Sequence, residues 1–190
     1  MDALALLTAD HNRVRGLIAR FKTAKDSDDT QVLSQLATEI IDELQVHTSI
    51  EETQFYPWVK GISEDTKDTV TEGVEEHHVV KMLISEIQAL EPGDDQWVAK
   101  MTVLIENVEH HAKEEEEELF PTVRSNTSAT DRETLGEKLE AEKKKLGAPV
   151  LADKIDLTLA ELKALASTQE IPGRSTMDHD ELAATVAPPS

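Results

Sequence analysis

Apolar residues recur at steps of three and four in four successive stretches of the chain. The stretches lie at about 4–21, 33–55, 70–87 and 97–115. This spacing places the apolar side chains on one face of an α-helix. Three short polar connections separate the stretches, at about 26–29, 61–63 and 91–94. Because short loops between long helices make neighbours antiparallel, the pattern predicts an all-α, up-down antiparallel four-helix bundle.

A fifth helical pattern follows the bundle. Thr130 and Glu133 have the spacing of a capping box at its start, and Gly147-Ala148-Pro149 should end it. Its apolar positions are Leu135, Leu139 and Leu146. We therefore expect the bundle and its fifth helix to occupy residues 1–147.

Residues 153–187 show a smaller pattern of their own. Thr158 and Glu161 indicate another capped helix start, and Ile171-Pro172-Gly173-Arg174-Ser175 is typical of a loop. A last short helix should span about 178–186. The sequence thus predicts a small C-terminal helix–loop–helix appendage.

Charge and cysteine content exclude several kinds of function. The 190-residue chain has a net charge of −20 and no cysteine. Such a surface repels nucleic-acid phosphates and anionic lipids, and the lack of cysteine excludes disulfides and thiolate-bound zinc. The start of the chain lacks the positive charge and long apolar stretch of a signal peptide, and no segment is apolar enough to span a membrane. We expect a soluble, cytoplasmic protein.

Six polar residues occupy positions in the apolar stripes that should face the core. They are His11, His47, Glu51, His77, His111 and Glu115. A buried carboxylate is costly unless it is paired or bound to a metal. Two carboxylates and four imidazoles on the same inward faces therefore predict a cation site.

The two His-x-x-x-Glu pairs belong to a repeated motif. His47-x-x-x-Glu51-Glu52-x-x-x-Tyr56-Pro57 matches His111-x-x-x-Glu115-Glu116-x-x-x-Phe120-Pro121 position for position. Residues four apart lie one helical turn apart, so each His and Glu point the same way. The match predicts a pseudo-twofold axis through the site. Each aromatic–proline pair should end its helix, with Tyr56 and Phe120 as packing residues there.

These motifs in this order resemble the hemerythrin-like, or HHE cation-binding, domains over roughly residues 3–125. The matching pieces also include Asp10-His11 and Glu76-His77. The resemblance implies two irons joined by an oxo or hydroxo group and by two of the carboxylates. It assigns Glu51 and Glu115 as the bridging carboxylates, and His11, His47, His77 and His111 as the terminal imidazoles.

One position departs from that family's pattern. Oxygen-carrying hemerythrins have a further His one turn before the third-helix His, and this chain has Gly73 there, with Lys81 one turn after. The resemblance then implies an extra open or water-filled position, or another carboxylate. The missing imidazole at Gly73 disfavours reversible oxygen carriage and favours redox chemistry with small oxidants.

Other polar residues near the motifs have simpler interpretations. His78 and His110 lie one position off the stripes and should face solvent. The run from Glu114 to Glu118 should be a solvated face, apart from Glu115. Glu52 and Glu116 are the nearest candidates for partners of the ligand histidines.

The C-terminal appendage resembles the small helix–loop–helix at the N-terminus of the transcription terminator Rho and related SAP-like modules. The matching stretch runs from Leu157 to Leu182. Those modules often contact nucleic acid, but this copy has more acids than bases. We therefore expect it to bind a protein partner or to pack, without contacting nucleic acid.

The sequence leaves three functions in competition. The first is a non-haem di-iron protein that reacts with oxygen, hydrogen peroxide or nitric oxide, with catalase-like peroxide breakdown as one form. The second is an iron or oxygen sensor that signals through its tail without turnover. In the third, zinc or manganese fills the site in a structural role. The six inward residues favour iron, and they do not decide between turnover and sensing.

Overall fold

The computed structural model describes residues 1–26, 29–63, 65–147, 159–168 and 171–177, together with residues 182 and 185. Its helices follow in the order α1 (Ala3–Asp26), α2 (Thr30–Ile50), η1 (Glu51–Phe55), α3 (Tyr56–Val59), α4 (Asp65–Gln88), α5 (Asp95–Glu114), η2 (Glu115–Leu119), α6 (Phe120–Asn126), α7 (Ala129–Lys145) and α8 (Leu159–Thr168). The segments η1 and η2 are π-helical. The described residues contain no strand, so the predicted all-α class is confirmed.

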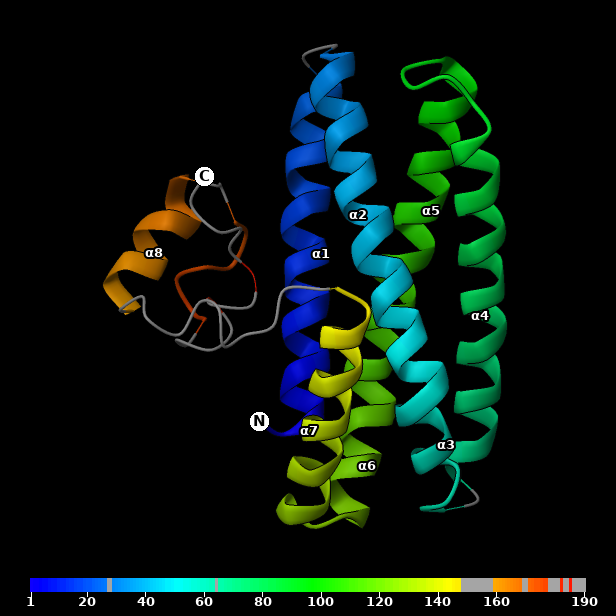
Figure 1. The fold of residues 1–190 in the computed structure, drawn as a ribbon, viewed down its shortest axis with the longest axis vertical. Coiled ribbons are helices and arrows are strands. Elements are labelled where there is room, and N and C mark those ends of the chain that lie inside the picture. Colours follow the sequence, from blue (N-terminus) through cyan, green and yellow to red (C-terminus); the bar gives the residue numbers. More distant parts are fainter. Residues whose placement is uncertain are drawn as a thin grey trace.

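Four long helical rods form the bundle (Figure 1). α1 packs against α2, and α4 packs against α5. Two apolar clusters fill the interior, one including Leu7 and Ile50 and the other including Val14 and Leu44. Since the candidate ligands lie between members of the two clusters on each rod, they occupy a polar layer between two apolar ones. Each fully buried aliphatic or aromatic side chain contributes about 1.5–3 kcal/mol, so both clusters hold the rods around that layer.

Both His-x-x-x-Glu motifs run directly into a π-helical turn. The backbone N–H of Tyr56 donates to the carbonyl of Glu51, and that of Phe120 to the carbonyl of Glu115. The prediction that the aromatic–proline pairs end these helices is wrong, because α3 and α6 continue beyond Pro57 and Pro121. The wider π turn already interrupts the α-helical hydrogen-bond ladder, so a proline immediately after it is accommodated.

The fifth helix, α7, packs against α1, α2 and η1. Its start differs by two residues from the prediction, because Ser128 and Asp131 form the capping box in place of Thr130 and Glu133. Its end agrees with the sequence, since Gly147 adopts a φ of 75° that other residues rarely take. Leu146 does not extend the buried face, because it is 44% exposed.

Part of the C-terminal appendage is described. Leu162, Ala166, Ile171 and Leu182 form a small apolar cluster. Ile171 lies against α1, since a Cβ atom built on Gly16 would be 3.0 Å from its Cδ1. Residues 148–158, and most of the last helix predicted at 178–186, lie outside the described residues. Among the described helices, none is long and apolar enough to cross a membrane.

Candidate metal centre

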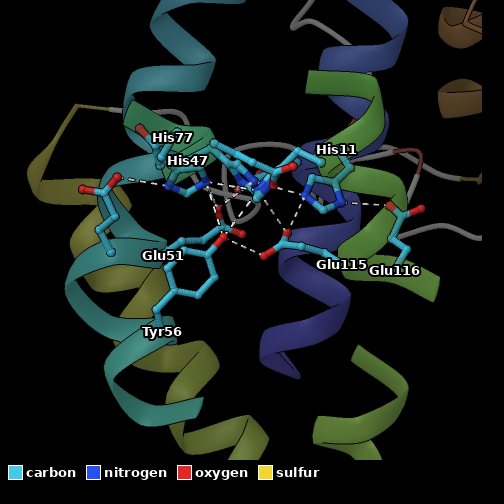
Figure 2. A network of polar contacts seen from close by, with 12 residues as sticks. His11, His47, Glu51, Tyr56, His77, Glu115 and Glu116 are labelled. Carbon is cyan, nitrogen blue, oxygen red and sulfur yellow. Dashed lines mark hydrogen bonds and ion pairs between the residues drawn. The ribbon is translucent and has the colours of Figure 1, made fainter. Parts of the chain in front are cut away.

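The six inward residues predicted from the sequence meet in the polar layer of the bundle (Figure 2). They come from α1 (His11), α2 (His47), η1 (Glu51), α4 (His77), α5 (His111) and η2 (Glu115). Every one is at most 6% exposed. The candidate centre is therefore closed off from bulk water by four rods of the bundle.

The Nε2 atoms of the four imidazoles face one another in two pairs. His11 Nε2 lies 3.1 Å from His47 Nε2, and His77 Nε2 lies 3.1 Å from His111 Nε2. A neutral imidazole that carries its proton on Nδ1 offers only a lone pair at Nε2. Two such lone pairs facing each other repel, and a shared cation removes that repulsion.

The two buried carboxylates join these pairs. Glu51 Oε2 lies 3.2 Å from His47 Nε2 and 3.3 Å from His77 Nε2. On the other side, Glu115 Oε2 lies 3.3 Å from His11 Nε2 and 3.8 Å from His111 Nε2. Each carboxylate thus reaches one imidazole of each pair, as the pseudo-twofold repeat predicted.

A carboxylate also faces the Nδ1 atom of every one of these histidines. We call these four acids the outer carboxylates. The Nδ1-to-oxygen distances are 2.8 Å for His11–Glu116, 3.6 Å for His47–Asp10, 3.0 Å for His77–Glu52 and 2.6 Å for His111–Glu76. At His11, His77 and His111 these partners are within hydrogen-bond distance, so they hold the proton on Nδ1, fix the ring orientation and leave Nε2 free for a metal. Asp10 is too far from His47 Nδ1 for a hydrogen bond, and the two make only a longer polar contact. Glu52 and Glu116 were predicted in this role, and Asp10 and Glu76 were not.

Basic side chains from other helices hold three of the outer carboxylates. Arg15 donates to both oxygens of Glu116 at 2.9 Å, and Lys81 donates to both oxygens of Glu52 at 2.6 Å. Arg15 and Lys81 each lie one turn beyond the histidine of their own helix, so the pseudo-twofold relation extends to them. Lys143 of α7 donates to Asp10, and both side chains are buried.

Tyr56 reaches into the centre, which corrects the prediction that it only packs at the end of the bundle. Its hydroxyl donates to Glu115 Oε1 at 2.9 Å and lies 3.4 Å from both His77 Nε2 and His111 Nε2 (Figure 2). Its counterpart Phe120 does pack, stacking on the His11 ring at a centroid distance of 5.9 Å. The pseudo-twofold symmetry is therefore broken at this position, and only one side of the centre receives a hydroxyl.

Burial and neighbouring charges shift the pKa values of ionisable groups in the centre. Burial and the charge of Glu115 raise the pKa of Glu51 well above its usual value. Burial opposes ionisation of Glu115 too, but the nearby imidazoles of His111 and His11 outweigh it and hold its pKa low. Burial and the charge of His111 lower the pKa of His77 to about 2. The imidazole of His77 is thus neutral near pH 7, as a metal ligand must be.

The residues present fit a bound metal. Both oxygens of Glu51 and Oε2 of Glu115 are buried and accept no hydrogen bond from the described residues. Candidate ligand atoms form two overlapping groups, one of His11, His47, Glu51 and Glu115, the other of Glu51, His77 and His111. Buried acceptors without donors, next to the neutral imidazole of His77, are the chemistry of a cation site.

Residues 2–123 match the hemerythrin HHE cation-binding domain. This chain belongs to the hemerythrin HHE cation-binding family. The match covers every residue of the candidate centre, and it identifies the buried histidines and glutamates as part of a metal-binding domain. The family resemblance proposed from the sequence motifs is confirmed.

The chain is also similar to a DNA nickase from Nostoc sp. (strain PCC 7120 / SAG 25.82 / UTEX 2576). The two are 28% identical over 148 residues, which is 77% of this chain and 40% of the relative. The chain therefore spans less than half the length of that protein. No solved structure matched the chain.

The roles of Asp10 and Glu76 could have been found in the sequence, whereas the role of Tyr56 could not. Asp10 and Glu76 each directly precede a ligand histidine, yet each serves the histidine of the neighbouring helix in its own half of the bundle. Their position directly before the candidate ligand histidines His11 and His77 was a usable signal. The contact of Tyr56 depends on the π turn before it, which no motif in the sequence indicated.

Proposed function

We propose that this HHE domain holds two iron ions and uses them to react with oxygen, hydrogen peroxide or nitric oxide. In this proposal His11 and His47 serve one ion, His77 and His111 serve the other, and Glu51 and Glu115 lie between the two. The observation that carries it is the arrangement of two Nε2 pairs, each 3.1 Å apart, joined by two buried carboxylates. A non-haem iron pair supplies redox chemistry and open coordination positions for small oxidants.

The chain itself controls the orientation and protonation of the ligands. Glu116 and Glu52 hold the Nδ1 protons of His11 and His77, and Arg15 and Lys81 keep those carboxylates in place. The imidazoles therefore cannot rotate or exchange tautomers without breaking ion pairs on the bundle surface. Such support makes the ligand more basic and the site more rigid.

Access to the centre is apolar on one side. A narrow pocket reaches the four histidines between Val14, Ile18, Leu44, Val80 and Val108. Apolar walls exclude charged solutes and disfavour ordered water, and they admit small uncharged molecules. This lining supports oxygen or nitric oxide as the partner of the centre on this side.

Tyr56 distinguishes this centre from one suited to reversible oxygen carriage. Its hydroxyl lies within 3.4 Å of two Nε2 atoms, on the side of α4 where Gly73 carries no side chain. We propose that the hydroxyl takes the place that an imidazole at position 73 would take. Burial and the charges of Glu51 and Glu115 raise the pKa of Tyr56 well above its usual value, so without metal it is a hydrogen-bond donor.

Peroxide turnover tests the catalytic form of this proposal. Iron-loaded protein should consume hydrogen peroxide and release oxygen, and His47→Ala should abolish both the iron and the activity. His78→Ala is the matched control, because His78 is exposed on α4 and should leave both unchanged. Iron-loaded protein that binds nitric oxide or oxygen but leaves peroxide unconsumed would favour the sensor form.

The sensor form is the second candidate, and the docking of the tail on α1 favours it. Ile171 packs at Gly16, five residues from His11 on the same helix. Gly16→Leu should displace the tail, since a Cβ atom alone would already lie 3.0 Å from Ile171 Cδ1 and leucine adds three more carbons. If the protein signals through its tail, protease cleavage after residue 147 should depend on metal in the wild type and not in this variant.

DNA nicking is a third candidate, raised only by the similarity to the Nostoc DNA nickase. The net charge of −20 argues against binding a phosphate backbone, so we propose that nucleic acid is not a partner. Supercoiled plasmid incubated with iron-, manganese- or magnesium-loaded protein should stay supercoiled. Relaxation that is lost in His47→Ala would overturn this part of the proposal.

A further inference from the structure

A second group of metal-ligand side chains lies just outside the buried centre. Glu76 of α4 and His110 and Glu114 of α5 bring ligand atoms within 4.8 Å of one another. His110 Nε2 lies 3.3 Å from Glu114 Oε1, one helical turn away. Unlike the six inward residues, this group is accessible, with His110 64% exposed and Glu114 36% exposed.

The two equivalent outer carboxylates Asp10 and Glu76 differ in the side chains that lie next to them. Asp10 and Glu76 are equivalent outer carboxylates, facing His47 and His111 respectively. Lys143 donates to Asp10. Among the described residues, the close charged neighbours of Glu76 are instead His111, His110 and another acid, Glu114. Two carboxylates so close repel each other unless a proton or a cation lies between them.

A polar recess connects two members of this group, Glu76 and Glu114, with the buried centre. Its walls include Glu72, Gly73, Glu76, Glu114 and Glu118, and it reaches Tyr56, His111 and Glu115 at its inner end. Glu115 is only 3% exposed, and its Oε2 accepts no hydrogen bond from the described residues. The recess thus leads from an accessible acidic surface to an unsatisfied buried carboxylate of the centre. The pocket between Val14, Ile18, Leu44, Val80 and Val108 has a single carboxylate, Glu109, in its lining.

We propose that Glu76, His110 and Glu114 form an outer binding site for a divalent first-row cation, through which metal reaches the buried centre. Two carboxylates and one imidazole suit ferrous iron, manganese and zinc. Because the site is exposed and offers three ligands, it binds metal weakly and releases it. Glu76 links the two sites, since its Oε2 also lies 2.6 Å from His111 Nδ1. The inference rests on the proposed function in that the buried centre takes up metal.

Anaerobic uptake of ferrous iron by the full-length apo-protein tests this site. Equilibrium dialysis of the wild type should show two tight equivalents and a third, weak one. His110→Ala and Glu114→Gln should each weaken the third by about tenfold or more, the usual effect of losing one metal partner. Both substitutions should also slow the rate at which ferrous iron enters the buried centre. Glu76 is left unchanged because it contacts His111.

His78→Ala is the matched control, an exposed histidine on α4 whose loss should change neither quantity. The site is overturned if His110→Ala keeps the third equivalent and fills the centre at the wild-type rate. Two tight equivalents without a weak one would also overturn it, and would leave the proposed di-iron centre standing. If the wild type binds only one weak equivalent of ferrous iron and His110→Ala loses it, the outer site is supported and the proposed di-iron function is contradicted.

Discussion

A Cβ atom built on Gly73 would lie 3.0 Å from the hydroxyl of Tyr56. The glycine on α4 and the tyrosine after the π turn are therefore one feature, since the missing side chain makes room for the phenol. Gly73 was interpreted from the sequence as an open position of the centre. The structure fills much of that space with a hydroxyl that also bonds to Glu115.

Gly73→Ala should destabilise the protein on the wild-type background and stabilise it on a Tyr56→Phe background. With the hydroxyl present, the added methyl overpacks a buried site, at a cost of about 1–3 kcal/mol. With the hydroxyl removed, the nearest remaining Tyr56 atom is 3.4 Å away, an ordinary contact. The gain of about 0.5–1 kcal/mol for replacing a helical glycine should then appear. Urea unfolding of the four proteins gives the answer, and equal effects on both backgrounds would contradict the account.

Glu116→Gln and Glu52→Gln should each lower metal affinity by roughly 10–100-fold without unfolding the bundle. Each removes the negative charge that fixes one Nδ1 proton, at His11 or at His77. Glu117→Gln is the control, since Glu117 is exposed and 65% of its side-chain surface is accessible. Competition with a chromophoric chelator measures the affinity. Equal affinities in all three variants would show that the outer carboxylates do not support the ligands.

Lys143→Met should destabilise the protein by about 3–5 kcal/mol, because it leaves the buried carboxylate of Asp10 without its cation. Adding Asp10→Asn to this variant should recover much of the loss. Lys144→Met is the control, because Lys144 is exposed on the same helix. Chemical unfolding measures all three. A loss as large in the control, or no recovery in the double variant, would place the effect elsewhere in α7.

The same ion pair predicts a pH dependence. Burial opposes the charge of Asp10, but Lys143 and His47 outweigh it and hold the pKa of Asp10 below its usual value. A group with a lowered folded pKa contributes stability above its unfolded pKa of about 3.9, and loses it as the pH falls further. The wild-type apo-protein should therefore lose stability below about pH 4 more steeply than the Lys143→Met/Asp10→Asn variant. Parallel pH profiles would contradict this assignment.

Apo-protein should melt well below the metal-loaded protein. Burial and Glu115 raise the pKa of Glu51, so without metal a buried carboxyl must hold a proton or carry an uncompensated charge. A ligand at 1,000 times its dissociation constant stabilises the folded state by about 4 kcal/mol. Calorimetry of the two forms tests the coupling. Coincident melting curves would mean that metal does not bind the folded bundle.

The bundle and the six inward residues followed from the sequence because helical periodicity reports burial directly. His11 and Glu51 stood out since a polar residue in an apolar stripe needs a reason. The π turns could not be predicted, because η1 and η2 contain ordinary helix formers and differ from an α-helix by one hydrogen-bond register. Tyr56 was therefore predicted to pack at the end of the bundle, although its hydroxyl reaches the centre.

The partners of the ligands were harder to predict than the ligands themselves. Asp10 and Glu76 belong to the motifs, but they contact histidines on neighbouring helices, a relation that depends on how the rods are rotated. Lys143 lies more than 90 residues from His47, and only the packing of α7 brings it to Asp10. Spacing along one helix contains no information about such contacts.

The central claim is that the buried histidines and glutamates hold a pair of irons, and metal analysis tests it most directly. Protein from iron-replete cells should contain two irons per chain and show ferric charge-transfer absorption, and both should be lost in Glu51→Ala. One iron per chain, or zinc or manganese in a colourless protein, would contradict the di-iron account.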